Sequence, residues 1–376
     1  MNSDLCRRLG IEFPLFAFSH CRDVVAAVSR AGGMGVFGAV LTPPDKLRAE
    51  LDWIDTHCGG KPYGVDLIVP TSMQKQGDPA LSGQDLLAAL PETHKQFANS
   101  LLNDHGVGLD GLDDARLDMM HLSDNMNTTG AEAVLDIVFS YPIKLIANAL
   151  GTPPPIMMER AQAAGVPVAA LVGSKKHAEL QVAAGVDILV AAGGEAGGHC
   201  GEVSTMVLVP EIVSVANGTP VLAAGGIVNG AQMAAGIAMG AAGAWCGSVW
   251  LTTAEGEPPQ QIKDKMLAAT SADTVRSRSR TGKHSRQLKS AWTDAWETDG
   301  PDPLAMPYQS LVSEPALRKV EKLAQSGHEG AEKLSTYWVG QWVGLMNQVT
   351  SATAVVQEFK QDYLAAIDRL NSTLEG

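Results

Sequence analysis

The sequence predicts an α/β fold, a closed (β/α)8 barrel with an insertion after the third strand and a helical C-terminal extension. Short apolar runs alternate with helix-like stretches, which is typical of a parallel sheet covered by helices. Eight such units within about 250 residues favour a closed barrel over an open sheet. The strands are expected near residues 14, 34, 63, 144, 167, 186, 220 and 241.

The first three units follow from helix boundaries and apolar runs. A helix is expected over 22–31, because Gly32-Gly33 suits a helix C-cap. A second helix is expected over 43–57, since proline suits the first helical turn. The third strand is expected over 63–69.

Residues 71–129 interrupt the alternation with a polar, turn-rich segment that includes a helix expected over 94–102. Long insertions in compact domains are often lids or binding loops. We therefore expect a lid or substrate wall here, with a solvated excursion as the alternative.

The alternation then resumes and completes the barrel. Further helices are expected over 131–139, 156–164, 175–184, 205–215 and 230–239, with a short one after Gly247-Ser248. This assigns residues 1–256 to the barrel, interrupted by 71–129. Residues 257–376 are assigned to a basic segment and C-terminal helices, over 320–334 and 357–370, that pack on the barrel.

Bulk composition restricts the partners. The chain has 376 residues, 45% of them apolar, and a net charge of −13. This acidity argues against nucleic acid or an anionic membrane. No apolar run reaches the roughly 18 residues of a spanning helix, and no signal peptide is evident. Five scattered cysteines show no zinc pattern, so we expect a cytoplasmic protein with reduced thiols and no metal site.

The loop after the sixth strand has the strongest functional pattern. The glycine pairs 193–194 and 197–198 flank Glu195 and precede His199. Such glycines let the backbone approach a flat or anionic ligand, and a histidine there can exchange a proton with a neighbouring substrate. A solvated glycine-rich loop is the alternative. Glu195 is expected either to pin the loop or to face solvent.

The loops after the last two strands predict a phosphate site. In barrels of this kind, backbone N–H groups from these loops meet at the N-terminus of a short helix. The candidates are Gly225, Gly226, Gly247 and Ser248. Tight turns that need positive φ angles are the alternative.

A basic stretch, TVRSRSRTGKHSRQLKS, follows the barrel of this acidic chain. Its cations between Arg276 and Lys289 predict an anion site for a nucleotide or a CoA-type ligand. A solvated surface segment is the alternative.

Three stretches resemble the nitronate monooxygenase family, also called 2-nitropropane dioxygenases: AAGGEAGGHCGEVSTMVLVPEIV, VLAAGGIVNGAQMAAGIAMGAAGAWCGSVWLTTAE and TVRSRSRTGKHSRQLKSAWTD. ALGTPPPIMMERAQAAGVPV and AVSRAGGMGVFGA are also similar to family segments. These FMN-containing barrels include NADH:quinone reductases and flavin enoyl-acyl-carrier-protein reductases.

The resemblance implies FMN at the top of the barrel, with its phosphate on the four candidates of the last two loops. Gly197 and Gly198 would run beside the isoalloxazine, and Asn148, at the end of the fourth strand, would face the same site. His199 matches the family histidine near the reactive face of the flavin. The monooxygenases use it as a base, and the reductases use it to orient or protonate the substrate.

Two positions depart from the family. Members carry a small-residue segment resembling APMAG after the first strand, where this chain has Phe16 to His20; His20 either fills part of that site or is an ordinary surface or core residue. Members carry glutamine where this chain has Ala192, which cannot hydrogen-bond the flavin edge. These changes bear on the reaction more than on FMN binding, because most of the phosphate cradle is backbone.

The leading hypothesis is an FMN-dependent oxidoreductase that oxidises alkyl nitronates with O2, with His199 as base. One alternative is a reductase that uses NAD(P)H on a quinone, enone or acyl-CoA/ACP thioester. The other is a non-catalytic flavin-binding barrel. A sugar-phosphate isomerase or aldolase would explain the glycine pairs but not the EAGGH loop. The oligomeric state is not set by the sequence.

Overall fold

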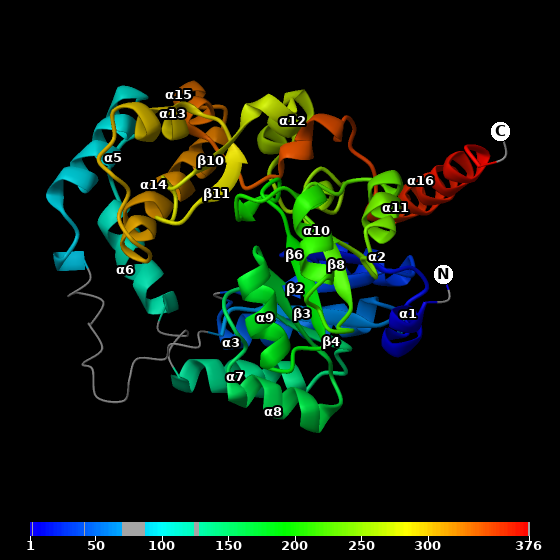
Figure 1. The fold of residues 1–376 in the computed structure, drawn as a ribbon. Helices are drawn as coiled ribbons and strands as arrows, with labels where there is room; N and C mark the ends of the chain where they lie inside the picture. The colour runs from blue at the N-terminus through cyan, green and yellow to red at the C-terminus, as the bar shows by residue number, and fades with distance from the viewer. Residues whose placement is uncertain (2, 41, 70–86, 124–127, 375–376) are drawn as a thin grey trace.

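The computed structural model describes residues 1, 3–40, 42–69, 87–123 and 128–374. The predicted eight-stranded barrel is confirmed (Figure 1). Each strand pairs with its neighbour in parallel, and the first strand closes the barrel on the last. The strands, in their order around the barrel, are β1 (Leu15–Ser19), β2 (Met34–Gly38), β3 (Tyr63–Leu67), β4 (Leu145–Asn148), β5 (Val168–Val172), β6 (Ile188–Ala192), β8 (Val221–Ala224) and β9 (Gly243–Cys246).

Alternate side chains of each strand face the barrel interior and the surrounding helices. In β1, Phe16 packs with Leu145 and Trp245 in the interior, whereas Leu15 and Ala17 belong to the outer apolar cluster. The surrounding helices lie within a few residues of their expected bounds: α2 (Arg22–Arg30), α3 (Pro44–His57), α7 (Thr128–Phe139), α8 (Pro155–Ala164), α9 (Lys175–Ala183), α10 (Thr205–Val213), α11 (Gly230–Ala238) and η2 (Ser248–Trp250).

The N-terminal helix α1 (Asp4–Leu9) was not predicted. Ser3 caps it by accepting a hydrogen bond from the Cys6 N–H group. Leu5, Cys6 and Leu9 pack with the interior side chains of the barrel. This helix therefore closes the barrel at the amino ends of its strands.

The basic segment forms a β-hairpin that the sequence analysis did not predict. Its strands β10 (Thr274–Ser277) and β11 (Ser285–Leu288) pair with β7 (Gly198–His199) in an antiparallel sheet of order β10-β11-β7. Ser285 lies opposite His199, and Arg286 lies opposite Gly198. The glycine loop of the barrel is therefore held in register by a segment more than 70 residues further along the chain.

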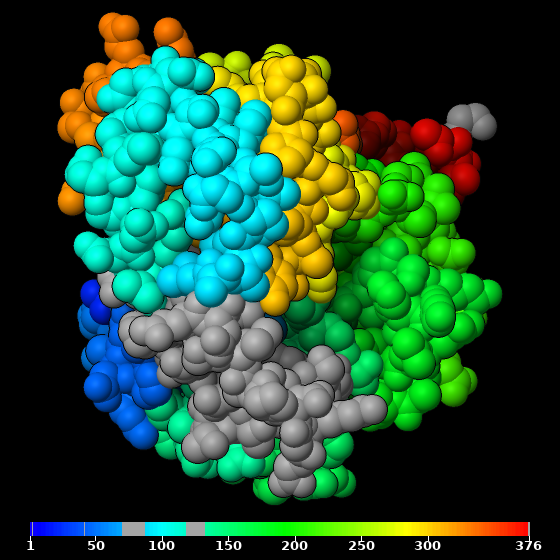
Figure 2. Space-filling model, turned by 90° about the vertical axis from the view of Figure 1, so that its left-hand side faces the viewer, coloured from blue at the N-terminus to red at the C-terminus, as the bar shows by residue number. Residues whose placement is uncertain are grey.

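Helices from two distant parts of the chain form a helical cap with its own apolar core (Figure 1). Leu102 of the insertion packs there with Trp292, Val312 and Leu334 of the extension. Figure 2 shows the two parts, cyan and yellow-orange, forming one continuous surface. The cap helices are α5 (Glu92–Asp104), α6 (Leu112–Ser123), α13 (Ala291–Thr298), α14 (Tyr308–Ala324) and α15 (Glu329–Leu334).

The predicted single helix over 320–334 is wrong, because α14 ends at Ala324 and α15 begins at Glu329. Gly327 between them has a φ of +82°, which a helix interior does not adopt. α12 (Gln260–Ala268) and η4 (Gln341–Leu345) pack with Leu288 of β11 in a small apolar cluster, and η3 (Ser271–Asp273) contacts η4.

The last helix, α16 (Ala352–Ser372), packs on α11 and α2 of the barrel (Figure 1). Its Phe359 stacks on Trp250 with ring centroids 6.5 Å apart. Within the described ranges, no helix combines the length and the apolar character needed to cross a membrane. Part of the predicted lid, residues 71–86 and 124–127, lies outside the described residues.

Candidate active site

The predicted site residues lie at the end of β4 or in the loops after β6, β8 and β9, at the carboxyl ends of the strands where barrel active sites form. The loops after β6 and β8 are in direct contact. A Cβ atom added to Gly225 would lie 2.8 Å from the Gly193 amide nitrogen. The fold therefore brings the predicted glycine loop beside the predicted phosphate loop.

The glycine loop is pinned on two sides. The Glu195 carboxylate accepts a 2.9 Å hydrogen bond from the Thr205 N–H group, which confirms the predicted pinning role. Arg286 of the hairpin donates from Nε and Nη2 to the Gly194 carbonyl oxygen, at 3.0 and 2.8 Å. These contacts fix the backbone that carries His199.

The two glycines before His199 differ in their surroundings. A Cβ atom on Gly197 would lie 2.7 Å from the Gly340 nitrogen, so this glycine permits a close approach of two backbones. Gly198 has a φ of +73° and no heavy atom of the described residues within 4 Å of an added Cβ. Gly198 therefore leaves open space beside the site.

The phosphate candidates offer a cluster of backbone donors. Gly225 and Gly226 have φ angles of +94° and +76°. Within the part of the chain that the structure describes, the N–H groups of Gly225, Gly226, Gly247 and Ser248 donate to no protein acceptor. Half-buried N–H groups without partners suit an anion. This observation fits the phosphate of a flavin nucleotide.

Residues 339–342 form a wall of the site that the sequence analysis missed. The Gly340 N–H group donates to Ser248 Oγ at 2.7 Å, and the Gln341 N–H group donates to the Glu195 carbonyl oxygen at 2.8 Å. A Cβ atom on Gly226 would lie 2.1 Å from Trp342 Cδ1. The glycines in VGQWVGL hint at close packing, but periodicity does not link them to a barrel some 90 residues away.

Asp66 of β3 is a second site residue that the sequence analysis missed. It alternates with Val65 and Leu67, which pack under the outer helices, so its side chain faces the barrel interior. It is 1% exposed, and its Oδ1 atom has no hydrogen-bond partner among the described residues. Burial raises its pKa to about 8, against a smaller opposing effect of a Leu67 backbone hydrogen bond. The carboxyl group is therefore protonated at neutral pH and can donate a hydrogen bond.

Asn148 is fully buried at the end of β4. Its Oδ1 accepts from the Val69 N–H group at 2.9 Å. Its Nδ2 donates to the carbonyl oxygens of Leu150 and Gly151 at 3.1 and 3.2 Å. These bonds join the loops after β3 and β4, and the predicted contact of Asn148 with the cofactor stays a prediction.

The segment from Phe16 to His20, which departs from the family pattern, places aromatic side chains beneath the site. Phe16 and Phe18 both stack on Trp245, with ring centroids 6.1 and 6.4 Å apart. His20 Nδ1 lies 2.7 Å from the Gly38 carbonyl oxygen. Ala192 packs at the edge of the same interior cluster.

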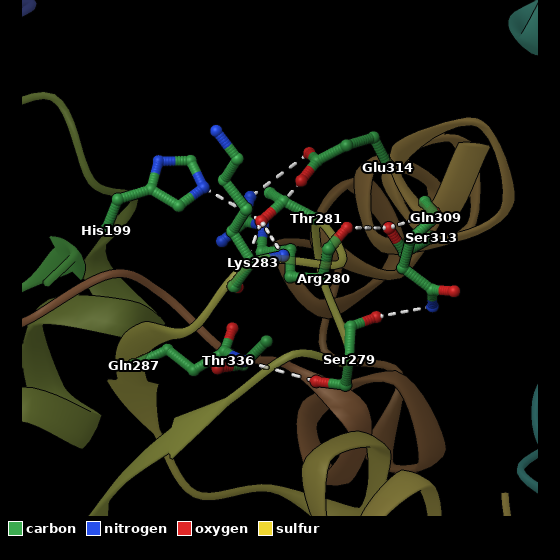
Figure 3. A network of polar contacts seen from close by, with 10 residues as sticks. All are labelled: His199, Ser279, Arg280, Thr281, Lys283, Gln287, Gln309, Ser313, Glu314 and Thr336. Carbon is green, nitrogen blue, oxygen red and sulfur yellow. Dashed lines mark hydrogen bonds and ion pairs between the residues drawn. The ribbon is translucent and has the colours of Figure 1, made fainter. Parts of the chain in front are cut away.

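His199 lies at the junction of the glycine loop, the hairpin and residues 336–342. Its Nε2 is 2.8 Å from Thr281 Oγ1 (Figure 3). Its ring centroid is 6.2 Å from that of Trp338. His199 as a whole residue is exposed, but neighbouring groups partly desolvate its ring, which lowers the pKa of His199, and the cations Lys283 and Arg280 lower it further. This lowered pKa favours the neutral form of the imidazole at pH 7. The pKa of the adjacent Cys200 thiol is raised by burial, which disfavours a thiolate nucleophile.

The arginines of the basic segment are engaged within the protein. Arg276 pairs with Glu202 at 3.3 Å, Arg278 with Asp302 at 2.9 Å and Arg280 with Glu314 at 2.6 Å. Arg286 holds the glycine loop, as described above. The segment is thus a structural part of the site, and the nucleotide or CoA-type ligand expected there stays a prediction.

Solved structures share this architecture. A nitroalkane oxidase from Streptomyces ansochromogenes aligns with a TM-score of 0.78 and 23% identity, covering 98% of this chain and all of that one. FabK from Thermotoga maritima aligns with a TM-score of 0.70 and 22% identity, covering 99% of both chains. These two likenesses establish the fold.

Sequence comparison gives the family. A Mycobacterium tuberculosis protein that carries the name of a monooxygenase, Rv1533, is 50% identical over 379 residues and the full length of both chains. A probable nitronate monooxygenase of Staphylococcus aureus is 26% identical over 358 residues, or 90% of each chain. The family model described as nitronate monooxygenase matches residues 8–362. The chain therefore belongs to the nitronate monooxygenase family of FMN-dependent oxidoreductases.

Proposed function

We propose that this enzyme oxidises alkyl nitronates with dioxygen and that His199 is its base. The observation that carries the proposal is the position of His199 on the glycine loop. Its pKa is lowered, and the loop lies beside the backbone N–H groups that have no acceptor among the described residues. A neutral imidazole at pH 7 can take the α-proton of a nitroalkane. The cations Lys283 and Arg280 near His199 favour the anionic nitronate that this proton transfer leaves.

The residues at the top of the barrel fit FMN. The N–H groups of Gly225, Gly226, Gly247 and Ser248 would hold the phosphate, and Gly198 leaves room for a flat ring. The protonated Asp66 would supply a hydrogen bond from below. When bound, FMN supplies the redox chemistry, accepting electrons from the substrate and passing them to dioxygen.

The protein also shapes the substrate pocket. Phe16, Phe18 and Trp245 form an apolar floor, which favours a small alkyl group and excludes water from beneath the site. Trp338 lies beside His199 and forms a further aromatic surface. These side chains would hold the α-carbon near the imidazole.

A reductase that uses NAD(P)H is the second candidate. A cleft of about 360 Å³ lies between the hairpin and α13, lined in part by Arg276, Arg278, His284 and Trp296. Cations beside an indole ring would suit a phosphorylated nucleotide. Asp302 and Glu202 offset much of this positive charge, so we rank this candidate second.

The first test is the visible spectrum of the purified protein, followed by two assays. FMN released on denaturation, identified by mass, is expected. Turnover of an alkyl nitronate with O2 supports the monooxygenase, and NAD(P)H-driven quinone reduction supports the reductase.

The His199→Ala variant tests the base. It should lose about 10²–10⁴-fold in turnover of the parent nitroalkane and keep its FMN. His57→Ala is the matched control, because His57 ends α3 and stacks on Trp53 away from the site. An unchanged rate in His199→Ala would show that this histidine is not the base.

A further inference from the structure

Among the described residues, the hydroxyl group of Thr281 is the hydrogen-bond partner of the His199 ring. Thr281 is 4% exposed and lies in the turn between β10 and β11. Its Oγ1 atom is 2.8 Å from His199 Nε2 (Figure 3). The other ring nitrogen, Nδ1, points away from Thr281 in the same view.

The other two contacts of Thr281 determine which atom carries the proton. Its Oγ1 accepts from the Lys283 N–H group at 3.3 Å and lies 3.3 Å from the Lys283 carbonyl oxygen, to which it donates. A hydroxyl group has one proton to donate and two lone pairs to accept. All three contacts are satisfied only when Nε2 of His199 carries a proton and donates it to Oγ1. The neutral ring then has an unprotonated Nδ1.

The turn that carries Thr281 is anchored to α14 of the helical cap (Figure 3). Ser313 donates from Oγ to the Arg280 carbonyl oxygen. Gln309 donates from Nε2 to the Ser279 carbonyl oxygen at 2.8 Å. The Arg280 guanidinium binds both carboxylate oxygens of Glu314, at 2.6 and 3.2 Å. Bonds from α14 to the two residues that precede Thr281 therefore hold this side of the turn in place.

We propose that Thr281 is a positioning residue that fixes the orientation and tautomer of His199, so that Nδ1 is the nitrogen that accepts the substrate proton. The proposal rests on the function proposed above, in which His199 is the base. Partners that fix the tautomer of a catalytic histidine are a recurrent device, because an imidazole in the wrong tautomer presents a proton where a lone pair is needed. α14 thereby links the cap to the chemistry at the barrel.

The first test reads the tautomer directly. The holoenzyme is labelled with ¹⁵N-histidine, and two-bond ¹H–¹⁵N correlations are recorded at a pH where His199 is neutral. The His199→Gln variant identifies the His199 signals by their loss. The expected result is a protonated Nε2 and an unprotonated Nδ1. A protonated Nδ1 in the unmodified enzyme would overturn the proposal without any variant of Thr281.

The second test uses a matched pair of variants. Thr281→Val keeps the shape of the side chain and removes the hydroxyl group, whereas Thr281→Ser keeps the hydroxyl group. Thr281→Val should give a mixture of tautomers and a loss of about tenfold in kcat/KM for a nitroalkane, comparable to one hydrogen bond. Thr281→Ser should retain the native tautomer and most of the activity.

The outcomes separate this proposal from the proposed function. If Thr281→Val keeps the native tautomer, or if Thr281→Ser loses it as Thr281→Val does, Thr281 does not position the ring. If Thr281→Val fails to fold, the spectra of the unmodified enzyme and of Thr281→Ser still decide. Full activity in His199→Ala would contradict the proposed base and leave the tautomer result standing as a structural fact.

Discussion

The guanidinium carbon of Arg280 lies 3.9 Å from the centroid of the Trp338 ring. The same guanidinium pairs with Glu314 through two hydrogen bonds, and both charged side chains are largely buried, with exposed fractions of 13% and 14%. Trp338 in turn neighbours His199. The helical cap, the hairpin and the glycine loop of the barrel therefore meet at one buried cation.

Removing the negative partner of this cation should be costly. Glu314→Gln removes the carboxylate that is hydrogen-bonded to Arg280 and leaves only the charge of Glu321 nearby, and breaking such a pair typically costs about 3–5 kcal/mol of unfolding free energy. Urea unfolding of the holoenzyme measures the change. Glu211→Gln, at an exposed position of α10, is the control and should change stability little. Equal stability of the two variants would show that the pair is not a structural anchor.

Asp66 predicts an unusual dependence of stability on pH. Its pKa is about 8 in the folded protein, against about 4 in an unfolded chain. Between these values the unfolded chain releases the proton and the folded protein keeps it, so stability falls as pH rises from about 4 to about 8. The limiting slope for this one group is about 1.4 kcal/mol per pH unit.

Asp66→Asn removes this effect, because the amide is neutral at every pH and retains a hydrogen-bond donor. Urea unfolding of the holoenzyme at pH 5, 6 and 7 should show a shallower decline for the variant and a higher stability at pH 7. Parallel stability curves for the two proteins would mean that Asp66 is ionised in the folded enzyme.

The barrel could be predicted because its signals are local. Apolar runs mark the strands, and caps such as Gly32-Gly33 mark the helix ends; both depend on residues close together in the chain. The glycine loop was found in the same way, since Gly198 and His199 are neighbours. Their chemistry, however, depends on contacts made across the fold.

The contacts of the hairpin and of residues 339–342 with the site could not be predicted, because they join segments that are far apart in the chain. No local pattern places Arg286 opposite Gly198, or Gly340 on Ser248. The cationic stretch suggested a ligand site, whereas the fold uses its arginines to bind carboxylates and a carbonyl oxygen of the protein. Asp66 sits within the apolar run YGVDLIV, and only the closed barrel shows that its carboxyl group is buried, with no charged partner among the described residues.

Lys283 should set the acid limb of the pH–rate profile. His199 must be neutral to accept a proton, and its pKa lies below the usual value because of partial desolvation of the ring first and then Lys283 and Arg280. The negative charge of Glu314 raises the pKa of His199 and so opposes these effects. Lys283→Gln removes one cation, so the pKa should rise and the acid limb of kcat/KM should move to higher pH. Lys289→Gln, an exposed lysine on the same hairpin, is the control. An acid limb that stays in place in Lys283→Gln would mean that another group governs it.

Gly198 offers a direct test of where the flavin lies. Its φ of +73° strains any other residue, but space is open at the position of an added Cβ. A valine there would project a side chain into the proposed position of the ring, so Gly198→Val should be purified with much less FMN than the unmodified protein.

Gly111 is a matched control, because its φ is +74° and it too has no heavy atom of the described residues within 4 Å of an added Cβ. Gly111→Val therefore suffers the same backbone strain on the helical cap and should keep its FMN. The FMN content is measured from the flavin absorbance relative to protein concentration. Full occupancy in Gly198→Val would place the flavin elsewhere, and equal losses in both variants would indicate backbone strain rather than contact with the ring.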